Sequence, residues 1–158
     1  MIDFKKIKQE IIDLYEECLN NQEPFHRKLD LFLVPNAIQK LVIEKTGIDL
    51  SAHWVCIDNF GIIHTLEQHG NPITEAKRGQ IAVIKEDFLI FLEVFLYPDD
   101  VKNIGLTKRT NLPLLQFEKE LDDKKIIIKE VRTVTSTKKN KVSRLVFHTM
   151  YKIKKSNK

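Results

Sequence analysis

The hydrophobic period of this 158-residue chain changes near Pro98, and that change is the strongest constraint on its fold. Before Pro98, apolar residues recur at the three- and four-residue spacing of amphipathic helices. After Pro98, apolar and polar residues alternate, which is the period of half-buried strands. The turn sequence Asp122-Asp123 separates two of these strands, and short turns make neighbouring strands antiparallel. The sequence therefore predicts an α+β protein, with N-terminal helices packed on a four-stranded antiparallel β-sheet.

The boundaries of these segments follow from residues that begin and end helices. Asp58 suits an N-cap, and Gly70 suits the left-handed position that ends a helix. In the helix between them, the spacing of Phe60, Ile63 and Leu66 predicts the buried side. The expected helices span residues 3–20, 35–46, 59–69 and 86–96, the expected strands span 102–107, 113–121, 124–135 and 142–153, and shorter extended pieces span 29–34, 53–57 and 81–84.

Charge is divided unevenly along the chain. Residues 1–100 hold 10 Lys or Arg against 17 Asp or Glu, whereas residues 101–158 hold 16 against 5. The net charges of the two parts are therefore −7 and +11, within a total of +4. One interpretation is an anionic partner for the C-terminal part, with nucleic acid ahead of an acidic membrane. The other interpretation is a solvated, lysine-rich sheet surface.

The composition excludes several other classes of protein. Hydrophobic residues make up 42% of the chain, which excludes a largely disordered protein. No apolar run reaches the roughly 18 residues needed to span a bilayer, and the charged start of the chain lacks signal-peptide character. Cys18 and Cys56 fit no metal or redox spacing, so we expect a cytoplasmic protein with two reduced thiols. The P-loop, dinucleotide-binding and serine-hydrolase motifs do not occur in the sequence.

Polar residues interrupt the apolar faces of the expected strands. Strict alternation places Thr149 on the same face as Phe147, and it places Lys119 on an apolar face of its own strand. Glu130 and Arg132 share a face in the same way. A charge on a buried face costs several kcal/mol unless it is paired or the face opens into a cleft. Two interpretations follow: a structural Glu130–Arg132 pair at the rim of the sheet, or a polar cleft that binds phosphate.

The segment from Asp58 to Gln80 carries the strongest chemical candidates. His64 lies in the body of the expected helix and His69 in its last turn, where the negative end of the helix dipole raises a histidine pKa. The basic loop that follows contains Lys77 and Arg78 and could hold an anion. Because His64 and His69 lie roughly 140° apart around a helix, they do not form a zinc-binding pair, and we expect no metal and no cofactor. Of the other histidines, His26 and His148 are taken as surface or core residues, and His53 as a core residue or one at the mouth of a site.

The order of several short motifs resembles one superfamily of nucleases. The stretches IIHTLEQHG, KRGQIAVIKEDF, YPD, KEVRT and HTMYK are similar, in this order, to phage-associated nuclease domains of the barnase, EndoU, colicin and RelE-like (BECR) superfamily. The resemblance covers about residues 50–153 and implies N-terminal helices on a four-stranded antiparallel sheet. It also implies metal-independent cleavage of RNA. Residues 1–50 would then be an N-terminal helical extension, and residues 51–155 the nuclease domain.

The resemblance implies attack of a ribose 2′-hydroxyl on the adjacent phosphate. Such a reaction needs a base, an acid and cations that stabilise the developing charge. We assign His69 or His64 as base or acid, and Glu130 either as the alternative base or as the group that orients Arg132. The remaining expected roles are stabilisation of the phosphorane by Arg132 and Lys119, a phosphate hydrogen bond from Thr149, and RNA binding by Arg78, Lys77 and Lys152.

Two other classes of function remain open. A non-catalytic nucleic-acid-binding or phage-associated interaction protein would use the basic C-terminal part for phosphate contacts without turnover. An inactive phage structural protein would neither bind nor cleave RNA. The nuclease interpretation predicts RNA as the partner and no membrane association. A toxin of this kind would also have a cognate inhibitor or immunity protein.

Overall fold

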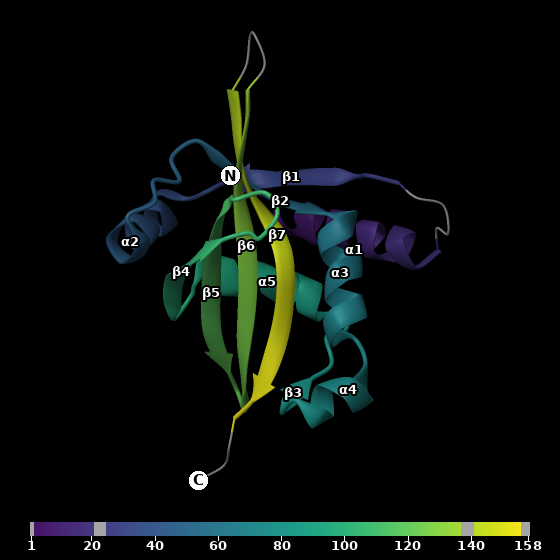
Figure 1. Cartoon of the computed structure of the whole chain (residues 1–158). Coiled ribbons are helices and arrows are strands. Elements are labelled where there is room, and N and C mark those ends of the chain that lie inside the picture. The colour runs from purple at the N-terminus through teal and green to yellow at the C-terminus, as the bar shows by residue number, and fades with distance from the viewer. Residues whose placement is uncertain (1, 21–24, 137–140, 156–158) are drawn as a thin grey trace.

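A computed structural model gives the architecture of the chain and describes residues 2–20, 25–136 and 141–155 (Figure 1). The protein has the predicted α+β composition: helices alternate with short strands up to Leu96, and the described elements that follow are all strands. In chain order, its elements are α1 (Phe4–Asn20), β1 (Lys28–Leu33), α2 (Asn36–Thr46), β2 (His53–Asp58), α3 (Asn59–His69), α4 (Pro72–Lys77), β3 (Gln80–Ile81), α5 (Asp87–Leu96), β4 (Asp100–Leu106), β5 (Pro113–Leu121), β6 (Lys124–Ser136) and β7 (Lys141–Lys154).

The strands form one mixed sheet of seven strands. Six of them follow the order β1-β2-β7-β6-β5-β4, and β3 pairs with the end of β7. The pairs β4–β5, β5–β6 and β6–β7 are antiparallel, as predicted from their short connections and alternating pattern. In contrast, β2 runs parallel to the first half of β7.

The predicted four-stranded antiparallel sheet is therefore wrong in size and in strand direction. The four C-terminal strands are present, but β7 is not an edge strand, because β2 and β3 pair with successive parts of its other side. Backbone N–H and C=O groups of a central strand need partners on both sides, and these two short strands supply them. A parallel pair is joined by a long crossover and leaves no turn motif, so local sequence patterns cannot reveal it.

Helices α1 and α5 cover one face of the sheet, and within the described ranges no helix lies over the opposite face, which we call the open face (Figure 1). Aromatic contacts fix α5 on the covered face. Phe88 and Phe91 contact Phe147 of β7 edge to face, and Phe95 packs against Phe117 of β5. One hydrophobic core includes these side chains and residues from α1 to β7. None of the described helices is long and apolar enough to cross a membrane.

A β-bulge in β7 changes which residues face the helices. Lys129 of β6 pairs with Thr149, and the next residue, Glu130, pairs with Phe147, which leaves His148 as the extra residue. As a result, Phe147 and Met150 are both buried against the helices, and Thr149 lies on the open side. The predicted alternation, which places Thr149 on the face of Phe147, is wrong because one inserted residue exchanges the two faces.

Helix α3 lies along the edge of β7, and its first turn makes the closest approach. Asp58 accepts a hydrogen bond from the amide of Gly61 at 2.9 Å, as predicted for an N-cap. A Cβ atom at Gly61 would lie 2.5 Å from the carbonyl oxygen of Phe147, so only glycine fits here. This contact turns Ile62 inward and leaves Phe60 57% exposed. The predicted buried side of this helix is therefore wrong at Phe60.

The chain after α3 contains a short helix that the sequence pattern did not predict. Asn71 caps α4 by accepting hydrogen bonds from the amides of Ile73 and Thr74. Gly70 does end α3, but its φ of −93° is right-handed, so the predicted left-handed conformation is wrong. Glycine is required at this position for a different reason, since a Cβ atom would lie 2.5 Å from the carbonyl oxygen of Leu66.

Candidate active site

Two histidines from separate elements meet beside the open face. His64 comes from the middle of α3, and His148 is the bulged residue of β7. Their rings stack, with centroids 5.3 Å apart and planes inclined by 29°. In the described part of the chain, the histidines that make hydrogen bonds or ion pairs are His26, His53 and His69, and not these two. The nitrogens of His64 and His148 are therefore available to a ligand.

A cavity of about 290 Å³ opens beside the two stacked rings, and both histidines line it. Asp58 and Phe60, from the start of α3, form part of its wall. Val131 and Val146 pair across β6 and β7 and supply apolar lining from the sheet. The cavity thus combines apolar surface with a few titratable groups, which is the composition typical of ligand-binding sites.

Burial sets the protonation of one of these histidines. Burial lowers the pKa of His148 below its ordinary 6.5, and the neighbouring His64 and Lys129 lower it further, while Asp58 acts in the opposite direction. A histidine with a lowered pKa is largely neutral at pH 7 and can accept a proton. His148 therefore has the properties of a general base.

A cationic and aromatic strip continues from the two histidines along the open face. The ammonium nitrogen of Lys129 lies 5.6 Å from the centroid of the Tyr151 ring, within the range of a cation–π contact. Burial raises the pKa of Tyr151, and the nearby Glu118 raises it further. Tyr151 therefore stays protonated at neutral pH, and its hydroxyl is both a hydrogen-bond donor and an acceptor.

Farther along the same face, one buried carboxylate holds two lysines in place. Glu118 lies 2.8 Å from the ammonium nitrogen of Lys102 and also binds Lys125, and its side chain is only 3% exposed. Burial alone would raise the pKa of Glu118, but hydrogen bonds from Lys102, Lys125 and Gln116 outweigh it and lower the pKa to about 2. The cluster therefore remains charged and ordered at neutral pH.

The other predicted histidine, His69, lies at the opposite end of α3 in a structural cluster. Its ring stacks on Tyr151, and its Nδ1 lies 3.1 Å from a carboxylate oxygen of the fully buried Glu75. Arg78 donates from Nη1 to the other oxygen of Glu75 at 3.2 Å and to the carbonyl of Gln68 at 3.1 Å. We call His69, Glu75 and Arg78 the α3–α4 cluster, because their contacts join these two helices.

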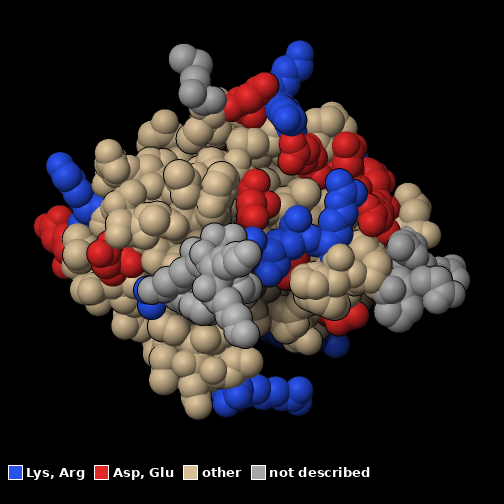
Figure 2. Space-filling view, turned by 90° about the horizontal axis from the view of Figure 1, so that it is seen from above, with Lys and Arg blue, Asp and Glu red and all other residues tan. Residues whose placement is uncertain are grey.

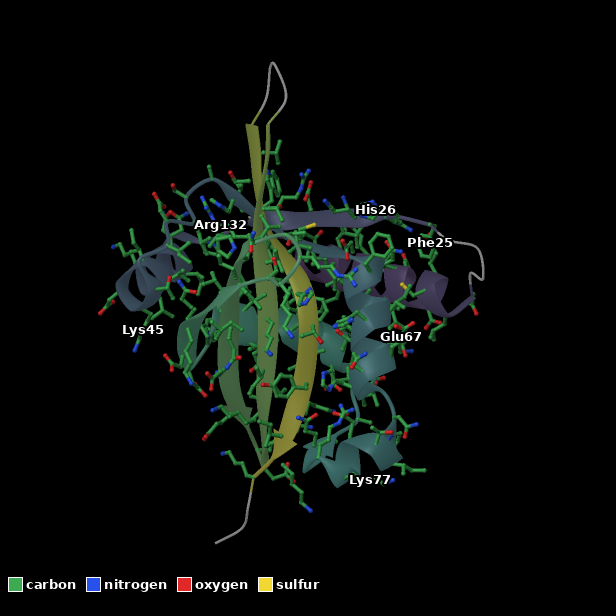
Figure 3. All side chains as sticks on the ribbon, viewed as in Figure 1. Phe25, His26, Lys45, Glu67, Lys77 and Arg132 are labelled. Atoms are coloured by element: carbon green, nitrogen blue, oxygen red, sulfur yellow. The ribbon has the colours of Figure 1, made fainter. Side chains whose placement is uncertain are left out.

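Two of the predicted cations lie on the helix-covered side of the sheet. Arg132 donates from Nε to Nε2 of His53 at 2.9 Å, and Nδ1 of His53 lies 2.9 Å from the carbonyl oxygen of Ser51. Lys119 donates to the carbonyl oxygen of Tyr97 at 2.8 Å, at the end of α5. Both side chains therefore have structural partners. Figure 3 shows Arg132 at the same end of the sheet as His26 and far from Lys77, which is the last residue of α4.

Three further predicted residues are buried. Glu130 is 0% exposed, neither of its carboxyl oxygens has a hydrogen-bond partner among the described residues, and burial raises its pKa well above the ordinary value. The ammonium nitrogen of Lys152 lies 2.7 Å from Asp87, and both side chains are inaccessible. Thr149 is 7% exposed and pairs with Lys129. Of the predicted catalytic residues, His64, His69 and Thr149 thus lie on the open side, and Lys119, Glu130 and Arg132 lie on the covered side.

The strand pattern does not single out His148 or Lys129, which the structure brings to the cavity region. The position of His148 depends on the bulge, and the sequence carries one sign of it. Phe147 and Met150 are both strongly apolar but three residues apart, which breaks the two-residue period. The sign is weak, since Tyr151 continues the original alternation.

On the side of the molecule seen from above, positive and negative surface charges are mixed, and Figure 2 shows Lys and Arg beside Asp and Glu there. Ion pairs join the acidic first part of the chain to the basic second part, as between Asp30 and Arg144 at 2.8 Å. Ion pairs of the folded protein therefore compensate part of the charge difference along the sequence.

Among the described residues, no group of three or more His, Cys, Asp or Glu side chains could hold a metal ion. The chemical groups that the site does offer are two imidazoles, the Lys129 ammonium group and the Tyr151 hydroxyl. These are groups that transfer protons and bind phosphate.

An α+β fold with helices on one sheet face and proton-transfer groups on the other is compatible with a nuclease. The comparison with protein families defines this class further, since the model of the phage-Barnase-EndoU-ColicinE5/D-RelE like nuclease 3 family matches residues 34–158. The chain therefore belongs to this nuclease family, as its sequence motifs predicted. Neither the curated proteins nor the solved structures contain a significant match to it.

Proposed function

We propose that this protein is a metal-independent endoribonuclease that cleaves RNA at the cavity between α3 and β7. The observation that carries the proposal is the stacking of His64 on His148 beside that cavity. Two imidazoles of this kind can act as the base and the acid of one reaction. Membership of a nuclease family supports the same reaction class.

The roles follow from the environment of each side chain. His148, whose pKa is lowered, accepts the proton of the ribose 2′-hydroxyl as this oxygen attacks the adjacent phosphorus. The bond from phosphorus to the 5′-oxygen breaks, and His64 donates a proton to that leaving oxygen. Lys129 stabilises the negative charge that develops on the phosphate. The products are a 2′,3′-cyclic phosphate and a free 5′-hydroxyl.

The residues of the covered face are not part of this proposal. Arg132 and Lys119 are bonded to His53 and to the end of α5, and Lys152 is enclosed with Asp87. Glu130 is buried, its raised pKa favours the protonated form, and its oxygens have no hydrogen-bond partner among the described residues, so neither of its expected roles enters the proposal. Arg78 and Lys77 lie at the far end of α3 and could contact only a more distant part of an RNA strand.

The test is cleavage of a labelled RNA by the full chain in the presence of EDTA. We expect fragments that end in 2′,3′-cyclic phosphate, and we expect no cleavage of a matched strand with a 2′-deoxyribose at each position. Cleavage of the deoxyribose strand, or loss of all cleavage when EDTA is added, would contradict the mechanism.

A second function has one observation in its favour. Several of the basic residues that could have acted in catalysis are bound in internal contacts, as described for Arg132, Lys119 and Lys152. A module that binds nucleic acid without cleaving it would need only the exposed lysines of the open face. Intact RNA that binds in a strongly salt-dependent way would favour this alternative.

A further inference from the structure

Phe60 presents a large, exposed aromatic ring where a substrate would lie. Its side chain is 57% exposed, although it sits in the first turn of a helix that is packed against the sheet. Single exposed apolar residues are common and need no explanation. Phe60 differs from such residues because it lines the cavity that His64 and His148 also line.

The ring of Phe60 is also held in place by contacts with neighbouring side chains. His26 packs against it with ring centroids 4.9 Å apart, and Nε2 of His26 lies 3.7 Å from a carboxylate oxygen of Asp58. Asp58 in turn caps α3 through the amide of Gly61. The cap of the helix, His26 and Phe60 therefore form one connected unit, so the aromatic ring is positioned before any ligand arrives.

The size and lining of the cavity restrict what it can take. Its volume of about 290 Å³ lies at the lower limit of common ligand pockets, which span roughly 300–1,000 Å³. Val131 and Val146 add apolar surface from the sheet. A flat aromatic ring of modest size fits these constraints better than a chain of several nucleotides.

We infer that Phe60, with Val131 and Val146, forms a subsite for one nucleobase next to the reacting phosphate. This inference rests on the proposed ribonuclease function, because it assigns the base of a nucleotide whose phosphate lies at His64 and His148. Stacking on an aromatic side chain accepts any base, since every base has a π-face. The subsite therefore positions the substrate without selecting a sequence.

The experiment compares binding of a nucleoside 3′-monophosphate with binding of ribose 3-phosphate, which lacks the base. Affinities are measured by calorimetry for the full-length wild-type chain and for Phe60→Ala. We expect Phe60→Ala to weaken nucleotide binding by about 5- to 150-fold, from the measured range of base–aromatic stacking. Binding of ribose 3-phosphate should not change. Phe60→Tyr should restore nucleotide affinity, because it restores the ring.

A matched control is Tyr97→Ala, which removes an aromatic side chain that is 69% exposed on the other side of the molecule. It should leave both affinities unchanged. The inference is overturned if wild type binds the nucleotide no better than ribose 3-phosphate, or if Phe60→Ala weakens both ligands equally. If the nucleotide binds through Phe60 but RNA is never cleaved, the subsite stands and the proposed catalytic function fails.

Discussion

The middle and the C-terminal end of α3 each place a histidine against a ring of β7, and the geometry of the two contacts is the same. The centroids of His64 and His148 are 5.3 Å apart with planes inclined by 29°, and His69 and Tyr151 have the same distance and angle. Their surroundings differ. His69 is bonded to the buried Glu75, whereas His64 and His148 line an open cavity.

The difference shows that ring stacking alone does not identify a catalytic histidine. What matters is whether the ring nitrogens already have partners inside the protein. In the α3–α4 cluster, Glu75 bonds to both His69 and Arg78, so these two side chains already have a partner inside the protein. At the cavity, the corresponding nitrogens remain available for substrate.

The largest expected effect separates the two histidine contacts by activity. His148→Ala and His64→Ala should each lower kcat for RNA cleavage by about 10²- to 10⁴-fold, because each removes a proton-transfer group. His69→Ala should keep kcat near the wild-type value and lower the melting temperature instead. Steady-state kinetics and thermal unfolding of the three variants decide the matter. If His69→Ala lost as much kcat as His148→Ala, the proposed assignment of catalysis to His64 and His148 would be wrong.

The covered face of the sheet offers a third environment, in which a carboxyl group has no partner among the described residues. The pKa of Glu130 is raised in the folded protein, so as pH rises its carboxyl group loses its proton at a lower pH in the unfolded chain than in the folded protein. The free energy of unfolding should therefore fall above the ordinary carboxyl pKa, by up to about 1.4 kcal/mol per pH unit. Glu130→Gln cannot lose a proton and should abolish this part of the dependence, as measured by urea unfolding at several pH values.

The control for Glu130 is Glu67→Gln, which changes an exposed carboxylate on α3. It should leave the pH dependence of unfolding almost unchanged. If Glu130→Gln and wild type keep parallel curves from pH 4 to pH 8, Glu130 is not a buried neutral acid.

The α3–α4 cluster should contribute to stability and not to catalysis. Glu75→Ala removes the acceptor of both His69 and Arg78 and should lower the free energy of unfolding by roughly 1–3 kcal/mol. Ile73→Ala on the same helix alters a side chain that is 71% exposed and serves as the control. Urea unfolding and RNA cleavage are measured for both. If Glu75→Ala kept its stability but lost cleavage, the α3–α4 cluster would be the catalytic site and not a stabilising one.

The smallest expected effect is a shift in the pH dependence of cleavage. A base must be neutral to act, so kcat/KM should rise with pH through the pKa of His148, below 6.5. Lys129→Met removes a charge that lowers this pKa and should move the midpoint to higher pH. Asp58→Asn, which can still cap α3, should move it to lower pH. Midpoints that move in the opposite directions would exclude His148 as the base.

The parts of the fold that could be predicted from sequence are those that local forces decide. The cap at Asp58 and the boundaries of β5 follow from neighbouring residues, and both agree with the structure. The parallel pairing of β2 with β7 and the bulge at His148 depend on contacts between distant segments. Consequently, His64 could be found in the sequence as a candidate, but its partner could not.

The location of His148 at a β-bulge has a consequence for how this site can be altered. An amino acid in that position can be exchanged without shifting the strand, because the preceding and following residues keep their pairings with β6. Deleting it would remove the bulge and leave a regular ladder, in which Phe147 still pairs with Glu130 and Thr149 with Lys129. The bulge therefore adds an imidazole to the open side of β7 without changing which of its residues face the helices, so the chemistry at this position can change while the core stays undisturbed.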